Sequence, residues 1–90
     1  MTTYALIDEY SGFIWGVMDA PDPIAACRAV DADCHEYNRN YKDIGGGRFD
    51  GRSGYLAYEV PDGYTVNDGQ NQDSIDRIAA FPLVARIVIR

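Results

Sequence analysis

The chain is predicted to be an α+β protein. We expect a single small domain over residues 1–90, with elements in the order ββαβαβ and one mostly antiparallel four-stranded sheet with two helices packed on one face. Two kinds of pattern lead to this fold class. Four runs of aromatic and β-branched residues lie between turn residues, and two stretches carry apolar residues at helical spacing. A hydrophobic content of 47% is sufficient to fill a core, so the chain is not expected to be disordered.

The first two strands are expected over residues 4–8 and 13–18, as an antiparallel hairpin. Both runs are rich in aliphatic and aromatic side chains, and Glu9–Gly12 between them has the composition of a turn. Gly16 interrupts the second run. A glycine inside a strand marks a bulge or a close backbone approach.

The first helix is expected over residues 23–36. Asp22 is suited to cap it, and Pro23 is suited to its first position, where a missing N–H costs nothing. Cys27 and Cys34 would lie about 10.5 Å apart along this helix at 1.5 Å per residue, and a disulfide needs Cα atoms within about 7 Å. We therefore interpret both cysteines as buried thiols.

The second half of the chain begins with a long glycine-rich loop, expected over residues 38–54. A third strand follows at 55–60. A second helix is expected to be capped by Asp73 and to run from Ser74 to Phe81, because Pro82 ends it. Residues 83–90 form a continuous β-branched run, which favours a strand inside the sheet.

The charge is strongly negative and unevenly distributed. The chain has 14 acidic and 8 basic residues, a net charge of −6. Residues 1–36 contain seven acids and one base, and residues 59–76 contain five acids and no base. Nucleic acid is a poor partner for most of such a surface, because phosphate binding needs clustered Lys and Arg. A basic protein is the better electrostatic partner.

No motif of catalysis or of metal binding is present, so no catalytic residue, metal or cofactor is expected. Cys34 and His35 are adjacent, and neighbours on a helix do not face each other. Their spacing with Cys27 matches no zinc pattern. Gly45–Gly47 followed by Arg48 is not a phosphate-binding loop, which needs a Gly-Lys-Ser/Thr ending. We also find neither a membrane span nor a signal peptide, which predicts a cytoplasmic protein.

In overall character the chain resembles the small anti-CRISPR proteins of phages and mobile elements. The resemblance is one of type, over the whole length: a short, acidic, single-domain chain without enzymatic motifs. It implies a non-enzymatic inhibitor that binds a basic nucleic-acid-binding complex, such as a CRISPR effector, and blocks DNA binding as a DNA mimic. The partner-binding acids would be Asp31, Asp33, Glu36, Asp62, Asp68, Asp73 and Asp76.

Two other function classes stay open. One is a small cytoplasmic adaptor or protein-interaction domain, monomeric or homodimeric, which would use an exposed edge strand or the aromatic and basic loop. The loop residues of this alternative are Tyr41, Arg48, Phe49 and Arg52. The other is a small enzyme or ligand-binding protein, which would have a pocket containing Arg48 or Arg52.

Overall fold

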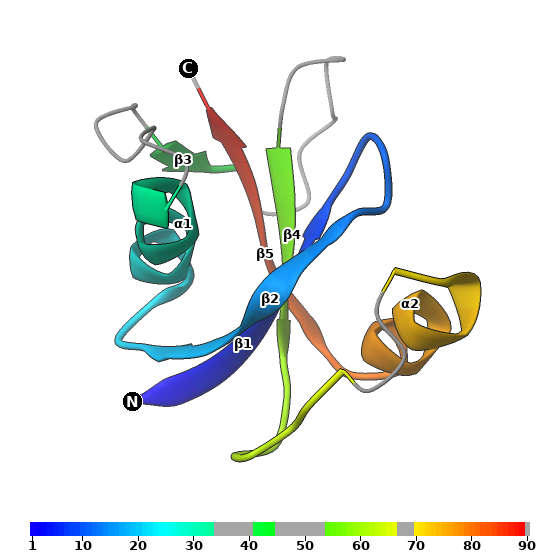
Figure 1. The fold of residues 1–90 in the computed structure, drawn as a ribbon. Helices are drawn as coiled ribbons and strands as arrows, with labels where there is room; N and C mark the ends of the chain where they lie inside the picture. The colour runs from blue at the N-terminus through cyan, green and yellow to red at the C-terminus, as the bar shows by residue number, and fades with distance from the viewer. Residues whose placement is uncertain (34–40, 45–53, 67–69, 90) are drawn as a thin grey trace.

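The structure, a computed structural model, describes residues 1–33, 41–44, 54–66 and 70–89. Its sheet lies between two helices (Figure 1). The elements in chain order are β1 (Thr2–Asp8), β2 (Ile14–Ala20), α1 (Pro23–Asp33), β3 (Tyr41–Asp43), β4 (Gly54–Glu59), α2 (Gln72–Ala79) and β5 (Leu83–Ile89). The predicted α+β class and the predicted order of its main elements are confirmed.

The sheet is antiparallel throughout, with strand order β2-β1-β4-β5-β3. The predicted hairpin is the β1–β2 pair, and β5 lies inside the sheet as expected. A fifth, three-residue strand, β3, joins the four predicted ones and lies within the predicted loop over 38–54. Three residues are too few to display a period of two. Only their pairing with the distant β5, Tyr41 opposite Ile89, makes them a strand.

The two helices lie on opposite faces of the sheet, so the prediction that both pack on one face is wrong. Tyr4 and Leu6 of β1 belong to the cluster that contains Cys27 of α1, whereas Ala5 and Ile7 belong to the cluster that contains Ile78 of α2. Figure 1 shows the sheet nearly edge-on, with one helix on each side. Because the interior strand β1 is apolar on both faces, each face needs a cover to exclude water.

A bulge in β2 changes which of its side chains share a face. Leu6 pairs with Gly16 and Ile7 pairs with Ile14, so Trp15 is the extra residue. Gly16 adopts φ +152°, a conformation that side chains other than glycine rarely allow. The bulge lets Ile14 and Val17, three residues apart, both pack on the α2 face. The predicted role of Gly16 is confirmed.

The helix ends follow capping chemistry. Asp22 caps α1 as predicted, because its carboxylate accepts a hydrogen bond from the Ala25 N–H at 2.8 Å. The cap predicted for α2 is wrong. Asn71, not Asp73, accepts from the Ser74 N–H at 2.8 Å, so the helix starts two residues earlier. The expected end of the first helix, residues 34–36, lies outside the described residues.

Candidate protein-binding surface

The N-terminal end of β1 holds two carboxylates against one buried hydroxyl. Thr3 pairs with Asp19 across β1 and β2, and its main-chain carbonyl accepts from Val60, which places the Pro61–Gly63 turn beside it. The Thr3 hydroxyl oxygen lies 2.5 Å from Asp19 Oδ1 and 2.8 Å from Asp62 Oδ1. A hydroxyl has one proton and can donate it to one of the two carboxylates at a time. Each carboxylate therefore keeps unused acceptor capacity.

Two more acids lie at the same end of the sheet, and we call the four together the acidic end. Glu59 is opposite Tyr4 in the β1–β4 pair, and Asp22 begins α1 directly after β2. The members of the acidic end are Asp19, Asp22, Glu59 and Asp62, all of them exposed. Within the described part of the chain, none of the four forms an ion pair.

Two cations of the described part of the chain, Arg77 and Arg86, are engaged in ion pairs elsewhere. Arg77 pairs with Asp73 on the surface of α2 at 2.8 Å. Arg86 contacts Glu9 at 3.0 Å, and both side chains are mostly buried. Neither pair offsets the charge of the acidic end, so its field is open to a cation from outside.

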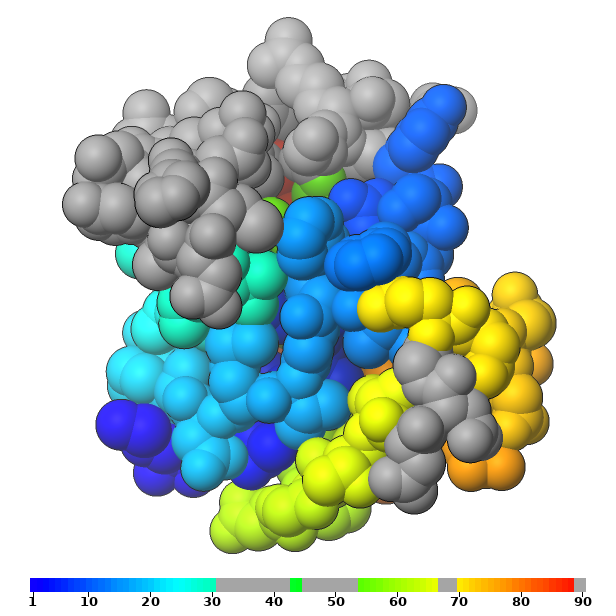
Figure 2. Space-filling view, viewed as in Figure 1, coloured from blue at the N-terminus to red at the C-terminus, as the bar shows by residue number. Residues whose placement is uncertain are grey.

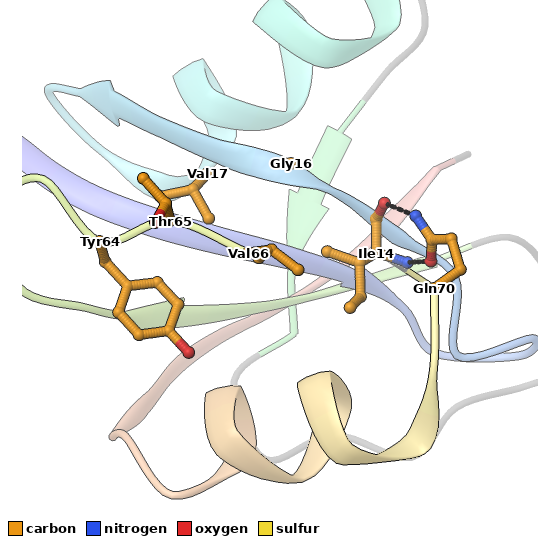
Figure 3. A pocket seen from close by; sticks show the side chains of 7 residues that line it. All are labelled: Ile14, Gly16, Val17, Tyr64, Thr65, Val66 and Gln70. Atoms are coloured by element: carbon orange, nitrogen blue, oxygen red, sulfur yellow. Dashed lines mark hydrogen bonds between the residues drawn. The ribbon is translucent and has the colours of Figure 1, made fainter. Parts of the chain in front are cut away.

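A groove borders the outer edge of β2 on the α2 face of the sheet. It contains a cavity of about 380 Å³. The extended segment Tyr64–Val66 forms its other wall, and the side chains of Ile14, Val17 and Val66 supply the apolar part of its lining (Figure 3). The residues lining it are Ile14, Gly16, Val17, Tyr64, Thr65, Val66 and Gln70. In the space-filling view, the segment that ends at residue 66 and the strand β2 both lie on the face toward the viewer (Figure 2).

The groove and the acidic end are continuous. Asp19 is two residues beyond Val17 on β2, and Asp62 is two residues before Tyr64 on the facing segment. Each wall of the groove therefore leads from apolar side chains to a carboxylate. A smaller cavity of about 240 Å³, lined by Ser11, Gly12, Phe13, Gln70, Asn71, Gln72 and Ile75, lies beyond the other end.

Gln70 separates the two cavities. Its side-chain amide makes two hydrogen bonds to the main chain of Ile14: the Ile14 N–H donates to Oε1, and Nε2 donates to the Ile14 carbonyl, both at 2.6 Å (Figure 3). The carboxamide thus occupies the place of a neighbouring strand's peptide group. Gln70 joins the segment before α2 to the edge of the sheet.

A buried polar cluster lies on the same face of the sheet. Glu9 Oε2 accepts no hydrogen bond from any described residue. Burial raises the pKa of the nearby Tyr58 above its ordinary value of 10.0, the Arg86 charge opposes the rise, and the Glu9 charge adds to it. Tyr58 is therefore neutral at physiological pH. We assign this cluster a structural role, because it connects the β1–β2 turn to β5.

The structure brings together only part of the predicted acidic surface. Asp62 belongs to the acidic end, whereas Asp73 and Asp76 lie on α2, where Asp76 accepts from Gln72 at 2.8 Å. Asp31 and Asp33 are in α1, but their side chains lie outside the described part. Sequence reasoning missed Asp19, Asp22 and Glu59 as a group, because only strand pairing makes these distant residues neighbours. Glu36 and Asp68 lie outside the described residues.

The residues predicted for the alternatives are largely undescribed. Tyr41 is in β3, where its main chain pairs with Ile89. Arg48, Phe49 and Arg52 lie outside the described residues, as does any pocket that they would line. Over the described ranges no group of three or more His, Cys, Asp or Glu side chains has a metal-binding arrangement. No described helix is both long and apolar enough to cross a membrane.

Comparisons with known proteins point to no function, so a functional proposal rests on the geometry of this surface. No protein-family model, curated protein or solved structure matches this chain.

Proposed function

We propose that this protein is a non-enzymatic binding inhibitor that presents its acidic end to a basic nucleic-acid-binding protein and blocks DNA binding there. The observation that carries the proposal is that Asp19, Asp22, Glu59 and Asp62 lie exposed at one end of the sheet and that no described residue forms an ion pair with any of them. The net charge of −6 supports it, because the whole chain contributes to the same field.

The mechanism is electrostatic competition. A protein that binds DNA carries Lys and Arg placed to neutralise phosphates, and carboxylates can occupy the same positions. The Thr3 hydroxyl donates to Asp19 or to Asp62 and keeps the two carboxylates close together, so one cation can bind both. Because the acidic end is exposed, added salt screens its charges and weakens the interaction. At 0.1 M salt the screening distance, the Debye length, is about 10 Å.

The partner class follows from the resemblance to anti-CRISPR proteins. A CRISPR effector keeps nucleic acid in a positively charged channel, which is the kind of surface that the acidic end complements. On this proposal the inhibitor acts in the cytoplasm, with a protein partner, without contacting nucleic acid, a membrane or a cofactor.

The test is competition for DNA. Purified protein is titrated into complexes of fluorescent duplex DNA with a CRISPR effector and with unrelated basic DNA-binding proteins. The double variant Glu59→Gln/Asp62→Asn is compared with Asp73→Asn/Asp76→Asn, which changes the net charge equally on α2. We expect displacement of DNA that falls at least about tenfold in the first variant and less than about twofold in the second, and that is lost above about 0.3 M salt.

Three results would contradict the proposal: no displacement from any partner, equal loss in both variants, or displacement insensitive to salt. The adaptor alternative stays a prediction, and a sedimentation mass tests whether the chain is a homodimer.

A further inference from the structure

The outer edge of β2 has main-chain groups that face away from the sheet. The Thr3 carbonyl accepts from Val60 in the segment that continues β4, so Thr3 and every second residue after it face β4. Their partners on β2, Asp19 and Val17, therefore direct their N–H and C=O groups outward. β2 is the last strand of the sheet, and no described residue hydrogen-bonds to the outward groups of Val17.

Gln70 shows that this edge accepts a peptide-like partner. The same rule directs the main-chain groups of Ile14 outward, and the Gln70 carboxamide satisfies both of them. A primary amide offers the same donor and acceptor as a peptide bond. Gln70 also blocks the edge at Ile14, which leaves Val17 and Asp19 for another strand.

The side chains beside the free edge define what such a strand would carry. Residues directly opposite each other in an antiparallel pair place their side chains on the same face. A residue opposite Val17 lies over the cavity, beside the apolar side chains of Val17 and Val66, and a residue opposite Asp19 lies beside the Asp19–Asp62 pair. Alternate residues of a strand are about 6.6–6.8 Å apart. The groove thus matches a basic residue and an apolar residue separated by one position.

We propose that the free edge of β2 binds an extended segment of the cationic partner as an added antiparallel strand. Running opposite to β2, the segment places Lys or Arg opposite Asp19 and, two residues later, an apolar side chain in the cavity beside Val17. This assignment rests on the proposed function and specifies the partner's chemistry. Charge selects a basic segment over a second copy of this chain, because two chains of net charge −6 would bring two Asp19-bearing edges together.

The test uses the whole protein and the peptide acetyl-Thr-Lys-Thr-Val-Thr-amide, followed by amide NMR. On binding, the Val17 amide should shift and become protected from hydrogen exchange. Methylation of the peptide's valine nitrogen should weaken binding at least about tenfold, because that N–H faces β2. Methylation of the central threonine nitrogen, which faces away, should change it less than about threefold. Replacement of the peptide's lysine by glutamate should abolish binding.

Protein variants test the charge contact separately. Asp62→Asn should weaken the peptide at least about fivefold, whereas the matched Asp76→Asn should not, because Asp76 lies on α2 away from β2. Equal effects of the two N-methyl peptides, or unchanged binding by Asp62→Asn, would overturn the strand-addition proposal. So would a Val17 amide already protected in a peptide-free dimer, which would make a second copy the occupant.

Peptide binding and DNA displacement test strand addition and inhibition independently. If the peptide does not bind at millimolar concentration while the protein still displaces DNA from its partner, the strand-addition proposal alone is refuted. If the peptide binds as described but no DNA is displaced, the inhibitor proposal alone is refuted.

Discussion

Removal of the Gln70 side chain is the sharpest test of how β2 is held. In Gln70→Ala the main-chain N–H and C=O of Ile14 both lose their partner. A typical hydrogen bond contributes about 0.5–1.5 kcal/mol to stability, so the two together contribute about 1–3 kcal/mol. Cavities open to solvent flank this contact, so water can replace part of it, which favours the lower half of that range.

The matched control is Gln72→Ala, the same substitution two residues later. Gln72 donates to Asp76 across one exposed turn of α2, a contact of about 0.2–0.5 kcal/mol that the higher helix propensity of alanine offsets. For a domain of this size, about 1 kcal/mol shifts Tm by about 4–8 °C. We expect Gln70→Ala to lower Tm by about 5–12 °C and Gln72→Ala to change it by less than about 2 °C.

Thermal unfolding followed by the fluorescence of Trp15, the single tryptophan, measures the Tm of both variants. Trp15 neighbours Ile14, so local loosening also affects the baseline. Amide hydrogen exchange gives a second readout, in which Ile14 should lose protection only in Gln70→Ala. Equal midpoints for the two variants, or an Ile14 amide that stays protected, would refute the strand-like role of Gln70.

Three further predictions concern α2 and the polar cluster beneath it. Asn71→Ala should destabilise the protein by about 0.5–2 kcal/mol, because Asn71 caps α2. Asp73→Ala should destabilise it by less than about 0.5 kcal/mol, because Asp73 forms only an exposed ion pair. The reverse order of the two urea midpoints would restore Asp73 as the cap. Ile78→Ala should lower the free energy of unfolding by about 2–5 kcal/mol, because the side chain is fully buried. Ile75→Ala, measured by the same urea unfolding, should lower it by less than half as much, because Ile75 is only partly buried. Similar losses in the two variants would mean that α2 does not bury Ile78. Because the pKa of Tyr58 is raised by burial in the folded state, its contribution to stability is present below the unfolded value of 10.0 and is lost as the pH rises through the folded value. The Tm of Tyr58→Phe should therefore fall less steeply than that of the unsubstituted protein as the pH rises from about 9 to about 11. Parallel curves of Tm against pH for the two proteins would contradict this.

Local patterns predicted the elements well where one residue type has one structural use. Gly16 marked the bulge because φ +152° is accessible to glycine, and Asp22 with Pro23 marked the start of α1. The cap of α2 was harder, since Asn71 and Asp73 are both good caps and differ only in which one reaches an open N–H. The strand β3 was not predictable, because three residues carry no periodic signal.

The candidate site was only partly predictable, for a related reason. Its acids lie on two separate segments, 19–22 and 59–62, which are brought to the same end of the sheet by the pairing of Thr3 with Asp19 and the contact of Asp62 with the Thr3 hydroxyl. The groove depends on Gln70, whose contact with Ile14 spans 56 positions in the chain. No local pattern contains such pairs.

Taken alone, the amino-acid sequence determined the α+β class, the order of the main elements, the negative charge and the position of the bulge. Each of these depends on a residue's own charge, volume and backbone preferences, or on those of its near neighbours. Tertiary structure decided that α1 and α2 cover opposite faces, that four carboxylates lie at one end of the sheet and that the edge of β2 is open. These properties depend on which strands pair and in what register. The pairing depends on burying both faces of β1 against residues that are distant in the chain.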